Sequence, residues 1–221
     1  MTSETDPRDL DPDIKDAVEG YQRFRREFER DKAFYKDLAV KKQKPRLLWI
    51  GCCDSRVMPS QITQADPGEL FEVRNIANCV PPAWADDEAV GAAIEYALGH
   101  LGVDDIVVCG HSGCGGIHAL AESIPPDEEA HLGRWVEYTR PAHQLVAAAR
   151  IDGEERIPAT IKAHILFQLD NLMTYDIVAK GVAEGRIGIH GWLYDMEQGE
   201  IQAYDPEAGR WRGLLEPAEI A

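Results

Sequence analysis

A continuous apolar run rich in β-branched residues, residues 104–110 (DDIVVCG), most limits what this chain of 221 residues can fold into. A run without polar alternation is typical of a strand in a parallel sheet that is covered on both faces. Residues 46–52 (RLLWIGC) also have the pattern of a buried strand, and residues 69–75 (ELFEVRN) form a third candidate. The sequence therefore predicts a sheet with buried parallel strands.

Helical patterns lie between and after these predicted strands. We expect helices over residues 89–101, 132–150 and 159–180, and a further helix that starts at about residue 117. The acidic, proline-bearing residues 122–129 are expected to form a loop. Two further strands are predicted at residues 186–195 and 200–205. Strands that alternate with helices predict an α/β fold, with a central, mostly parallel β-sheet flanked by helices.

The first 44 residues differ in character from the rest. Residues 2–13 are acidic and are expected to be a frayed arm, whereas residues 14–41 carry apolar side chains at helical spacing among dense charges. This pattern indicates one or two amphipathic helices that cover something, such as a partner subunit. We predict an N-terminal arm over residues 1–44 and a single α/β domain over 45–221, because the length suits one substantial core.

Charge and hydropathy exclude several classes of partner. The formal net charge is −16, whereas a protein that wraps nucleic acid is expected to carry basic stripes. The sequence has no apolar run near the ~18 residues that a membrane span needs, and residues 1–8 are too polar for a secretory signal. We expect no nucleic-acid or membrane partner, and a cytoplasmic location or a compartment assembled from the cytoplasm.

Potential metal ligands follow two of the buried strands. Cys52 ends one of them, and His111 and Cys114 follow the other. Ligands bind at the carboxyl ends of parallel strands, so these loops meet if the two strands are neighbours. Two thiolates and one imidazole suit zinc and leave a fourth position for water or substrate. Four glycines allow a tight turn here: Gly110, Gly113, Gly115 and Gly116. The alternative is an ordinary glycine-rich strand–helix turn.

The remaining cysteines need a separate interpretation. Five cysteines in a chain with no secretory signal favour metal binding or buried thiols over disulfides. Residues two apart in an extended chain share a face, so Cys52 and Asp54 can face one ion while Cys53 points away. We expect Cys53, Cys79 and Cys109 to be small packed thiols without a role in the chemistry.

Two motifs together, CCDSR at residues 52–56 and GHSGCGG at 110–116, resemble the motif pair of the β-class carbonic anhydrases. The segments GELFEVRNIAN, AAIEYAL and IHGWLYD resemble that family in order and spacing, so the resemblance covers roughly residues 43–194. Residues 14–41 resemble the family's N-terminal helical arm. The resemblance implies a carbonate dehydratase with one zinc ion per chain, held by Cys52, His111 and Cys114, in a homodimer or a dimer of dimers.

The resemblance also implies roles around the metal. Asp54 accepts a hydrogen bond from a zinc-bound hydroxide that attacks carbon dioxide and yields bicarbonate, and Arg56 holds Asp54 ionised through a bidentate pair. The pair also fits a simpler role as an ion pair that caps the turn. A substrate pocket is implied at Gln43, Phe71, Ile76 and Tyr96, with Tyr96 contributed by the neighbouring subunit.

A second set of residues resembles a non-catalytic bicarbonate pocket in the regulated subtype of the family: Trp49, Gly51, Arg74 and Tyr194. In the closed state of that subtype, Asp54 leaves Arg56 and becomes the fourth zinc ligand. Low pH and bicarbonate are expected to favour this state. The simpler interpretation is that Trp49 fills the core and that Arg74 pairs with an acidic neighbour.

Two other functions stay open. The same scaffold and hydroxide suit a hydrolase of carbon disulfide or carbonyl sulfide, and a zinc-stabilised binding module is an alternative outside the enzymes. The Asp54–Arg56 pair argues against the module, because a purely structural zinc site needs neither residue. Candidates for a proton shuttle are His118, His131, His143, His164 and His190. The physiological role, including a place in a carbon-fixing microcompartment, does not follow from the sequence.

Overall fold

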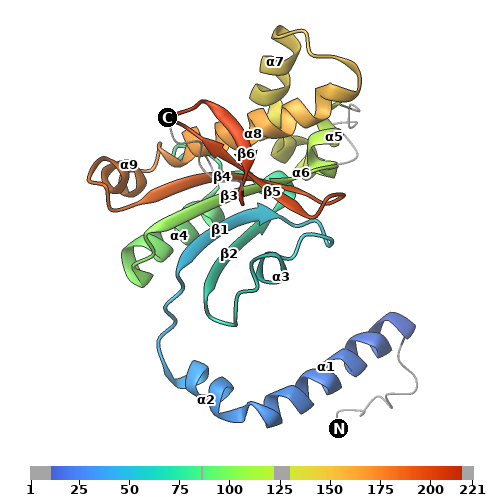
Figure 1. The fold of residues 1–221 in the computed structure, drawn as a ribbon, viewed down its shortest axis with the longest axis vertical. Helices are drawn as coiled ribbons and strands as arrows, with labels where there is room; N and C mark the ends of the chain where they lie inside the picture. Colours follow the sequence, from blue (N-terminus) through green and yellow to red (C-terminus); the bar gives the residue numbers. More distant parts are fainter. Residues whose placement is uncertain (1–10, 86, 122–129, 216–221) are drawn as a thin grey trace. The chain divides into compact units, whose positions relative to one another are not determined.

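The computed structural model describes residues 11–85, 87–121 and 130–215, and the chain divides into two compact units, residues 1–43 and 44–221. The first unit contains helices α1 (Pro12–Arg30) and α2 (Lys32–Val40), which are drawn in blue in Figure 1. The side chain of Asp11 caps α1 by accepting the N–H of Asp13 at 3.0 Å. The helix therefore begins within the segment predicted to be frayed; residues 2–10 of that segment lie outside the described residues.

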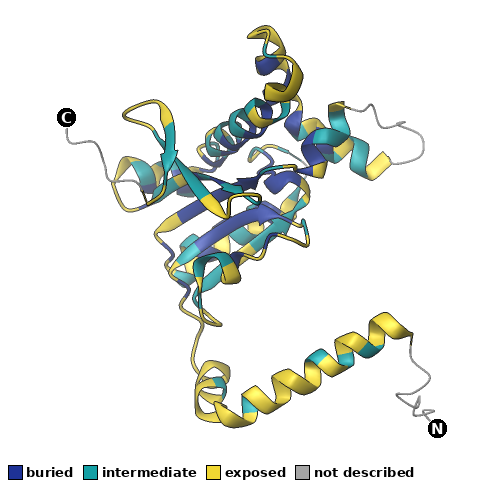
Figure 2. Cartoon of the chain, turned by 45° about the vertical axis from the view of Figure 1, so that its right-hand side comes forward, coloured by how far each residue is buried: buried dark blue, intermediate teal, exposed yellow. Residues whose placement is uncertain are grey.

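Aromatic side chains connect the two helices of the first unit. Tyr35 of α2 stacks on Phe28 of α1 with ring centroids 5.2 Å apart, and meets Phe24 edge-on at 5.5 Å. No residue of α1 or α2 is buried, as the yellow and teal colouring of Figure 2 shows. That these helices pack on a partner subunit stays a prediction.

The second unit is built on a sheet with the strand order β2-β1-β3-β4-β5-β6 across the described residues. Its strands are β1 (Leu47–Cys52), β2 (Leu70–Asn75), β3 (Asp105–His111), β4 (Gly188–Asp195), β5 (Glu200–Asp205) and β6 (Arg210–Gly213). Strands β2, β1, β3 and β4 pair in parallel, and β5 and β6 continue the sheet antiparallel. The predicted α/β fold with a mostly parallel central sheet flanked by helices is confirmed (Figure 1). Strand β6 was not predicted.

The helices of this unit are α3 (Pro59–Thr63), α4 (Glu88–Tyr96), α5 (Gly115–Ala121), α6 (Ala130–Val136), α7 (Arg140–Ala148), α8 (Arg156–Leu172) and α9 (Asp176–Ala183). Single turns of other helix types occupy Ile76–Asn78, Ala97–Leu101, Glu137–Thr139 and Gly153–Glu155. The helix predicted over residues 89–101 is therefore α4 continued by one wider turn, which stops at Gly102 in the left-handed conformation (φ 70°).

Two predicted helices are each broken in the structure. The segment 132–150 divides into α6 and α7, because Pro141 lies in the first turn of α7 and has no N–H to continue a helix from α6. The segment 159–180 divides into α8 and α9 because the backbone of Tyr175 is extended between them (φ −83°, ψ 120°). The loop predicted at residues 122–129 lies outside the described residues.

The sheet is buried on both faces, as predicted for its central strands. Leu48 and Ile50 of β1 face a large core that includes residues of α4, α5, α8 and α9. The alternate residue Trp49 faces the other side, where a smaller cluster contains Val107 and Cys109 and is packed by Leu47, Trp192 and Tyr194. Figure 2 shows the central strands in dark blue. In the described part of the chain, no helix has the length and apolar character to cross a membrane.

Candidate metal centre

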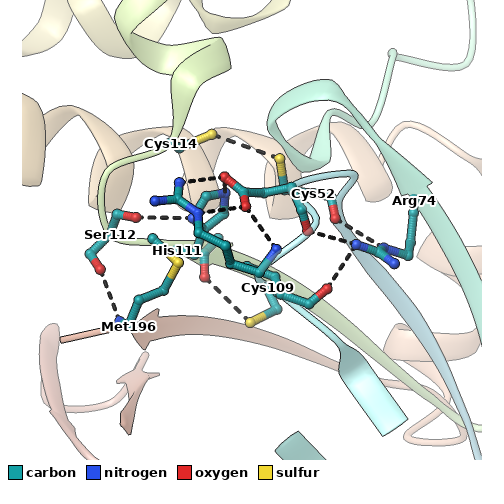
Figure 3. A network of polar contacts seen from close by, with 11 residues as sticks. Cys52, Arg74, Cys109, His111, Ser112, Cys114 and Met196 are labelled. Atoms are coloured by element: carbon teal, nitrogen blue, oxygen red, sulfur yellow. Dashed lines mark hydrogen bonds and ion pairs between the residues drawn. The ribbon is translucent and has the colours of Figure 1, made fainter. Parts of the chain in front are cut away.

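The predicted ligands converge at the carboxyl ends of two neighbouring strands. Strand β1 pairs in parallel with β3, which places Gly51 opposite Cys109 and brings the end of β1 beside His111. One ligand atom each from Cys52, His111 and Cys114 lie within 4.8 Å of one another, and all three residues are buried (Figure 3). The two strands are therefore neighbours, which was the condition for these loops to meet.

The hydrogen bonds of His111 define its tautomer. Its Nδ1 lies 2.9 Å from the carbonyl oxygen of Ser112, and a carbonyl only accepts, so Nδ1 carries the proton. The lone pair of Nε2 therefore points away from this bond, and Nε2 is buried without a hydrogen-bond partner among the described residues. Ser112 is itself fixed, because its N–H donates to Tyr194 at 3.0 Å and its Oγ accepts from Met196 at 2.9 Å (Figure 3).

The two sulfurs are free thiols that face each other. The Sγ atoms of Cys52 and Cys114 lie 3.9 Å apart, and both cysteines are free. The hydrogen bond between them lowers the pKa of Cys52 and raises that of Cys114, because one proton serves both sulfurs in the protein without metal. Backbone N–H groups also act on these pKa values: those of Asp54 and Ala77 lower the pKa of Cys52, and those of Gly116 and Ile117 oppose the rise at Cys114. Two stabilised sulfurs and one orphaned imidazole nitrogen are a donor set that fits zinc.

Two glycines are required by the geometry of this turn. Gly113 has a φ of 64°, which L side chains rarely adopt. A Cβ at Gly116 would lie 2.7 Å from Cγ2 of Ile76 and 2.9 Å from Cβ of Ala77. The second glycine therefore lets the loop after β2 approach the start of α5.

An ion pair borders the three ligands. Arg56 donates to Asp54 from Nε to Oδ1 at 2.9 Å and from Nη2 to Oδ2 at 2.6 Å, and its backbone N–H reaches Oδ1 at 3.0 Å. These bonds, those of the guanidinium above all, hold the pKa of Asp54 well below its ordinary value. Oδ2 of Asp54 also lies 3.9 Å from Nε2 of His111. An ionised carboxylate is thus fixed at the edge of the ligand cluster.

Arg74 holds the backbone of the turn that carries this pair. It lies opposite Gly51 in the β1–β2 register, and its guanidinium donates to the carbonyl oxygens of Cys52 (3.1 Å), Asp54 (2.8 Å) and Val57 (2.7 Å) (Figure 3). The interpretation in which Arg74 pairs with an acidic neighbour is wrong for the described residues, since carbonyl groups occupy the guanidinium instead.

The other predicted regulatory residues share the smaller cluster of the sheet. Trp49 is fully buried, with Tyr194 packed against the same cluster. Nε1 of Trp49 has no hydrogen-bond partner in the part of the chain that the structure describes. A Cβ at Gly51 would lie 2.5 Å from this Nε1, so the glycine makes room for the indole.

The predicted substrate residues are not all brought together within one chain. Ile76 directly follows β2, meets Gly116 and is 39% exposed. Phe71 and Tyr96 touch each other with ring centroids 5.9 Å apart. However, Phe71 pairs near the start of β1, whereas Asn75 pairs with its last residue, at the ligand cluster. Phe71 lies four residues before Asn75 on β2, a distance of about 13 Å. Gln43 is exposed and ends the first unit.

One prediction about the remaining cysteines is wrong. Cys53 is exposed, because it follows the last residue of β1, beyond the part of the sheet that the core covers. Cys79 and Cys109 are buried as predicted, and burial raises the pKa of Cys109 to about 12. Neither buried thiol belongs to the ligand cluster.

The predicted shuttle histidines lie in different surroundings. His190 pairs with Asp105 at 2.7 Å at the amino end of β3, about 20 Å along the strand from His111. His143 and His164 are buried, and His118 is half-buried on α5. His131 is exposed, and its Nδ1 lies 3.3 Å from Arg134. These positions do not single out a shuttle.

Sequence reasoning missed Ala77, whose backbone N–H helps to lower the pKa of Cys52. Ala77 adopts the left-handed conformation (φ 61°, ψ 28°), which an alanine gives no reason to expect. Ser112, which orients His111, was also missed, because it occupies a position that the motif leaves variable.

Together, the fold and this site define an α/β protein with a buried cluster of two cysteines and one histidine that could hold a metal ion. Residues 47–201 match the family model described as carbonic anhydrase. A carbonic anhydrase of Pseudomonas aeruginosa is 38% identical over 209 residues, which cover 94% of each chain. The chain therefore belongs to the carbonic anhydrase family, and the prediction of a carbonate dehydratase is confirmed.

Solved structures place the chain in the β class. The β-carbonic anhydrase CcaA superimposes with a TM-score of 0.86 at 36% identity, covering 90% of this chain and 98% of that one. A tetrameric β-carbonic anhydrase of Sordaria macrospora gives a TM-score of 0.78 at 30% identity, covering 87% and 97%. The predicted membership of the β class is confirmed.

Proposed function

We propose that this protein catalyses the reversible hydration of carbon dioxide to bicarbonate and a proton, with one zinc ion per chain held by Cys52, His111 and Cys114. The observation that carries this proposal is the cluster of three buried ligand atoms within 4.8 Å of one another, beside an ionised carboxylate. Zinc, when bound by three protein ligands, supplies a Lewis acid that lowers the pKa of a coordinated water.

The Asp54–Arg56 pair orients the attacking oxygen. Oδ2 of Asp54, which lies 3.9 Å from Nε2 of His111, accepts a hydrogen bond from the attacking water or hydroxide and so directs a lone pair toward carbon dioxide. Arg56 keeps Asp54 ionised and prevents its rotation, because the guanidinium bonds both carboxylate oxygens. A carboxylate held in this way accepts a hydrogen bond from the O–H of the attacking group without any reorganisation during the reaction.

The substrate pocket needs residues from two copies of the chain. Ile76 supplies an apolar wall beside the site. Phe71 lies about 13 Å along β2 from the site of its own chain, so it and Tyr96, which contacts it, serve the site of a second copy. Gln43 supplies a polar contact at this pocket. The tetrameric state of the Sordaria macrospora relative supports a homodimer or a dimer of dimers.

A bicarbonate-dependent closure of the site is the regulatory part of this proposal. Arg74 stabilises the turn that carries Asp54 through three carbonyl groups, so an anion that competes for its guanidinium loosens that turn. Asp54, once released from Arg56, would be the residue able to serve as a fourth ligand to a zinc ion held by Cys52, His111 and Cys114. Trp49, Gly51 and Tyr194 border the anion site, and the unpartnered Nε1 of Trp49 is available as a donor.

The catalytic proposal is tested by metal analysis and stopped-flow hydration. We expect one zinc per chain and carbon dioxide hydration that is lost in Cys114→Ser together with the metal. Carbonyl sulfide, assayed in parallel, should react more slowly. Full turnover in a metal-free Cys114→Ser protein would contradict the proposal, and faster carbonyl sulfide hydrolysis would assign a different substrate.

The regulatory proposal has its own test. Activity of wild type and Trp49→Phe is measured from neutral to alkaline pH with and without added bicarbonate. We expect the variant to lose bicarbonate inhibition and to keep more activity at neutral pH. Superimposable profiles, both insensitive to bicarbonate, would remove the switch and leave the catalytic proposal intact. We place the enzyme in the cytoplasm, or in a carbon-fixing microcompartment within it.

A further inference from the structure

The loop after β2 has an unusual backbone and directly contacts a metal ligand. Ala77 and Asn78 both have positive φ values, 61° and 47°, which non-glycine residues adopt rarely. Asn75 pairs with Cys52 across β1 and β2, and the backbone N–H of Ala77, two residues further on, helps to lower the pKa of the Cys52 thiol. Such a backbone persists only where its surroundings over-determine it, so the groups that hold Ala77 decide whether its N–H stays beside this sulfur.

His164 of α8 is the side chain that holds Ala77. Its Nε2 lies 2.7 Å from the carbonyl oxygen of Ala77, and that oxygen only accepts, so Nε2 carries the proton. Nδ1 must then accept, and it does so from Nε2 of Gln168 at 3.2 Å. His164 is 1% exposed, and burial lowers its pKa to about 4, so the imidazole is neutral. The carbonyl of Ala77 is thus held by the imidazole, while its N–H acts on the pKa of the Cys52 thiol.

The same helix holds the rest of the loop. Oε1 of Gln168 accepts the N–H of Val80 at 2.7 Å, and Nδ2 of Asn171 donates to the carbonyl of Val80 at 2.8 Å. Residues 164, 168 and 171 share one face of a helix, since neighbours on a face recur every three or four residues. The apolar face of α8 is fixed in the main core by Ile161 and Ile165. A rigid helix therefore determines the backbone conformation of loop 76–80.

We propose that His164 is a positioning residue of the metal centre, which keeps the N–H of Ala77 on the sulfur of Cys52. A hydrogen bond to a thiolate draws charge from the sulfur and leaves the bound metal a stronger Lewis acid. Groups that act on a ligand in this way commonly change metal affinity or activity 10- to 100-fold. The inference rests on the proposed metal site, and it assigns the site a determinant on a helix that carries no ligand.

The test replaces His164 in the full-length protein and measures the absorption spectrum of the cobalt(II)-substituted form. His164→Leu removes the bonds of the imidazole to Ala77 and Gln168 and its 3.9 Å contact with the sulfur of Cys79, at similar size, whereas His164→Gln retains an N–H donor for Ala77. Thr160→Val is the matched control, because Thr160 is fully buried on the same helix and, among the residues described, its hydroxyl donates only to the carbonyl of Arg156 in that helix. The readouts are the thiolate-to-cobalt charge-transfer band, zinc affinity by chelator competition, and hydrogen exchange of loop 76–80.

We expect His164→Leu to shift the charge-transfer band to longer wavelength, because a sulfur without its N–H donor is easier to oxidise. Zinc affinity should fall 10- to 100-fold, and the loop amides should exchange faster. His164→Gln and Thr160→Val should keep the wild-type band. If His164→Leu does not fold, His164→Met, which repacks more easily and also lacks a donor, serves the same comparison.

Two results separate this inference from the proposed function. A wild-type protein that takes up neither zinc nor cobalt at the three ligands would overturn the proposed metal site itself. A wild-type protein that binds cobalt, while His164→Leu or His164→Met keeps the same band and zinc affinity at lower stability, would overturn only the role of His164. Its network would then be structural.

Discussion

A single methyl group at Gly116 should disrupt the site, although the residue is neither a ligand nor charged. A Cβ built there lies 2.7 Å from Cγ2 of Ile76, 2.9 Å from Cβ of Ala77 and 3.3 Å from its backbone nitrogen. Carbon atoms pack best at about 3.5–4.0 Å, so the first two contacts are about 1 Å too short. Ile76 is partly exposed and can move, but the carbonyl of Ala77 is held by His164.

The adjacent glycine is a matched control. A Cβ at Gly115 meets nothing within 4 Å, and both glycines lie in the first turn of α5. Each alanine gains up to about 1 kcal/mol of helix propensity, so that gain cancels between the two variants. Overpacking at Gly116 costs about 1–3 kcal/mol. For a chain of 221 residues, this corresponds to a Tm about 2–12 °C below that of Gly115→Ala.

The assay is thermal unfolding of both variants at equal protein and zinc concentrations, because ligand binding and association shift Tm. Zinc content and turnover are measured on the same samples. We expect Gly116→Ala to melt earlier and to lose turnover, since moving Ala77 displaces its N–H from Cys52. Equal melting temperatures for Gly115→Ala and Gly116→Ala, with equal turnover, would refute the argument that this close approach is required.

Two further predictions concern charge. Arg56→Lys keeps the positive charge but lacks the planar fork, so kcat should fall about 10- to 100-fold with zinc content unchanged; an unaltered kcat would contradict the role of the bidentate pair. Burial lowers the pKa of His164 from 6.5, its value in the unfolded chain, to about 4 in the folded protein. The unfolded chain therefore binds the proton more tightly, and the free energy of unfolding decreases as pH falls from 6.5 to about 4. Between pH 7 and 5, wild type should lose about 2 kcal/mol more unfolding free energy than His164→Gln, as measured in urea; equal losses would show that His164 does not titrate in this way.

The strands and the ligand set were predictable because their signals are local. Residues 104–110 form an unbroken apolar run, and a parallel sheet leaves few places where its strand ends can meet. The motif then placed Cys52, His111 and Cys114 at those ends, where the structure gathers them. The breaks between α6 and α7 and between α8 and α9 were missed because hydrophobic periodicity continues across them. Only Pro141 gave a local signal.

Features that depend on long-range packing were not predictable from the pattern. The exposure of Cys53 depends on how far the core extends beyond β1, and the distance between Phe71 and the site depends on strand register. The three carbonyl groups that Arg74 binds come from a turn about 20 residues earlier in the chain. No periodicity or composition relates such segments.

One missed feature did leave a signal in the sequence. Helix α8 places polar residues 164, 168 and 171 beside the buried residues Ile161, Ile165 and Leu172, so helical periodicity alone puts them close to the core. A buried polar side chain without a partner costs about 1–3 kcal/mol, and helical backbone groups are already paired with one another. Such side chains must therefore bond a segment that lacks regular hydrogen bonds of its own. In this chain the segment is loop 76–80, which contains Ala77 and acts on the pKa of Cys52, so polar residues on the inner face of a core helix indicate where a functional loop is held.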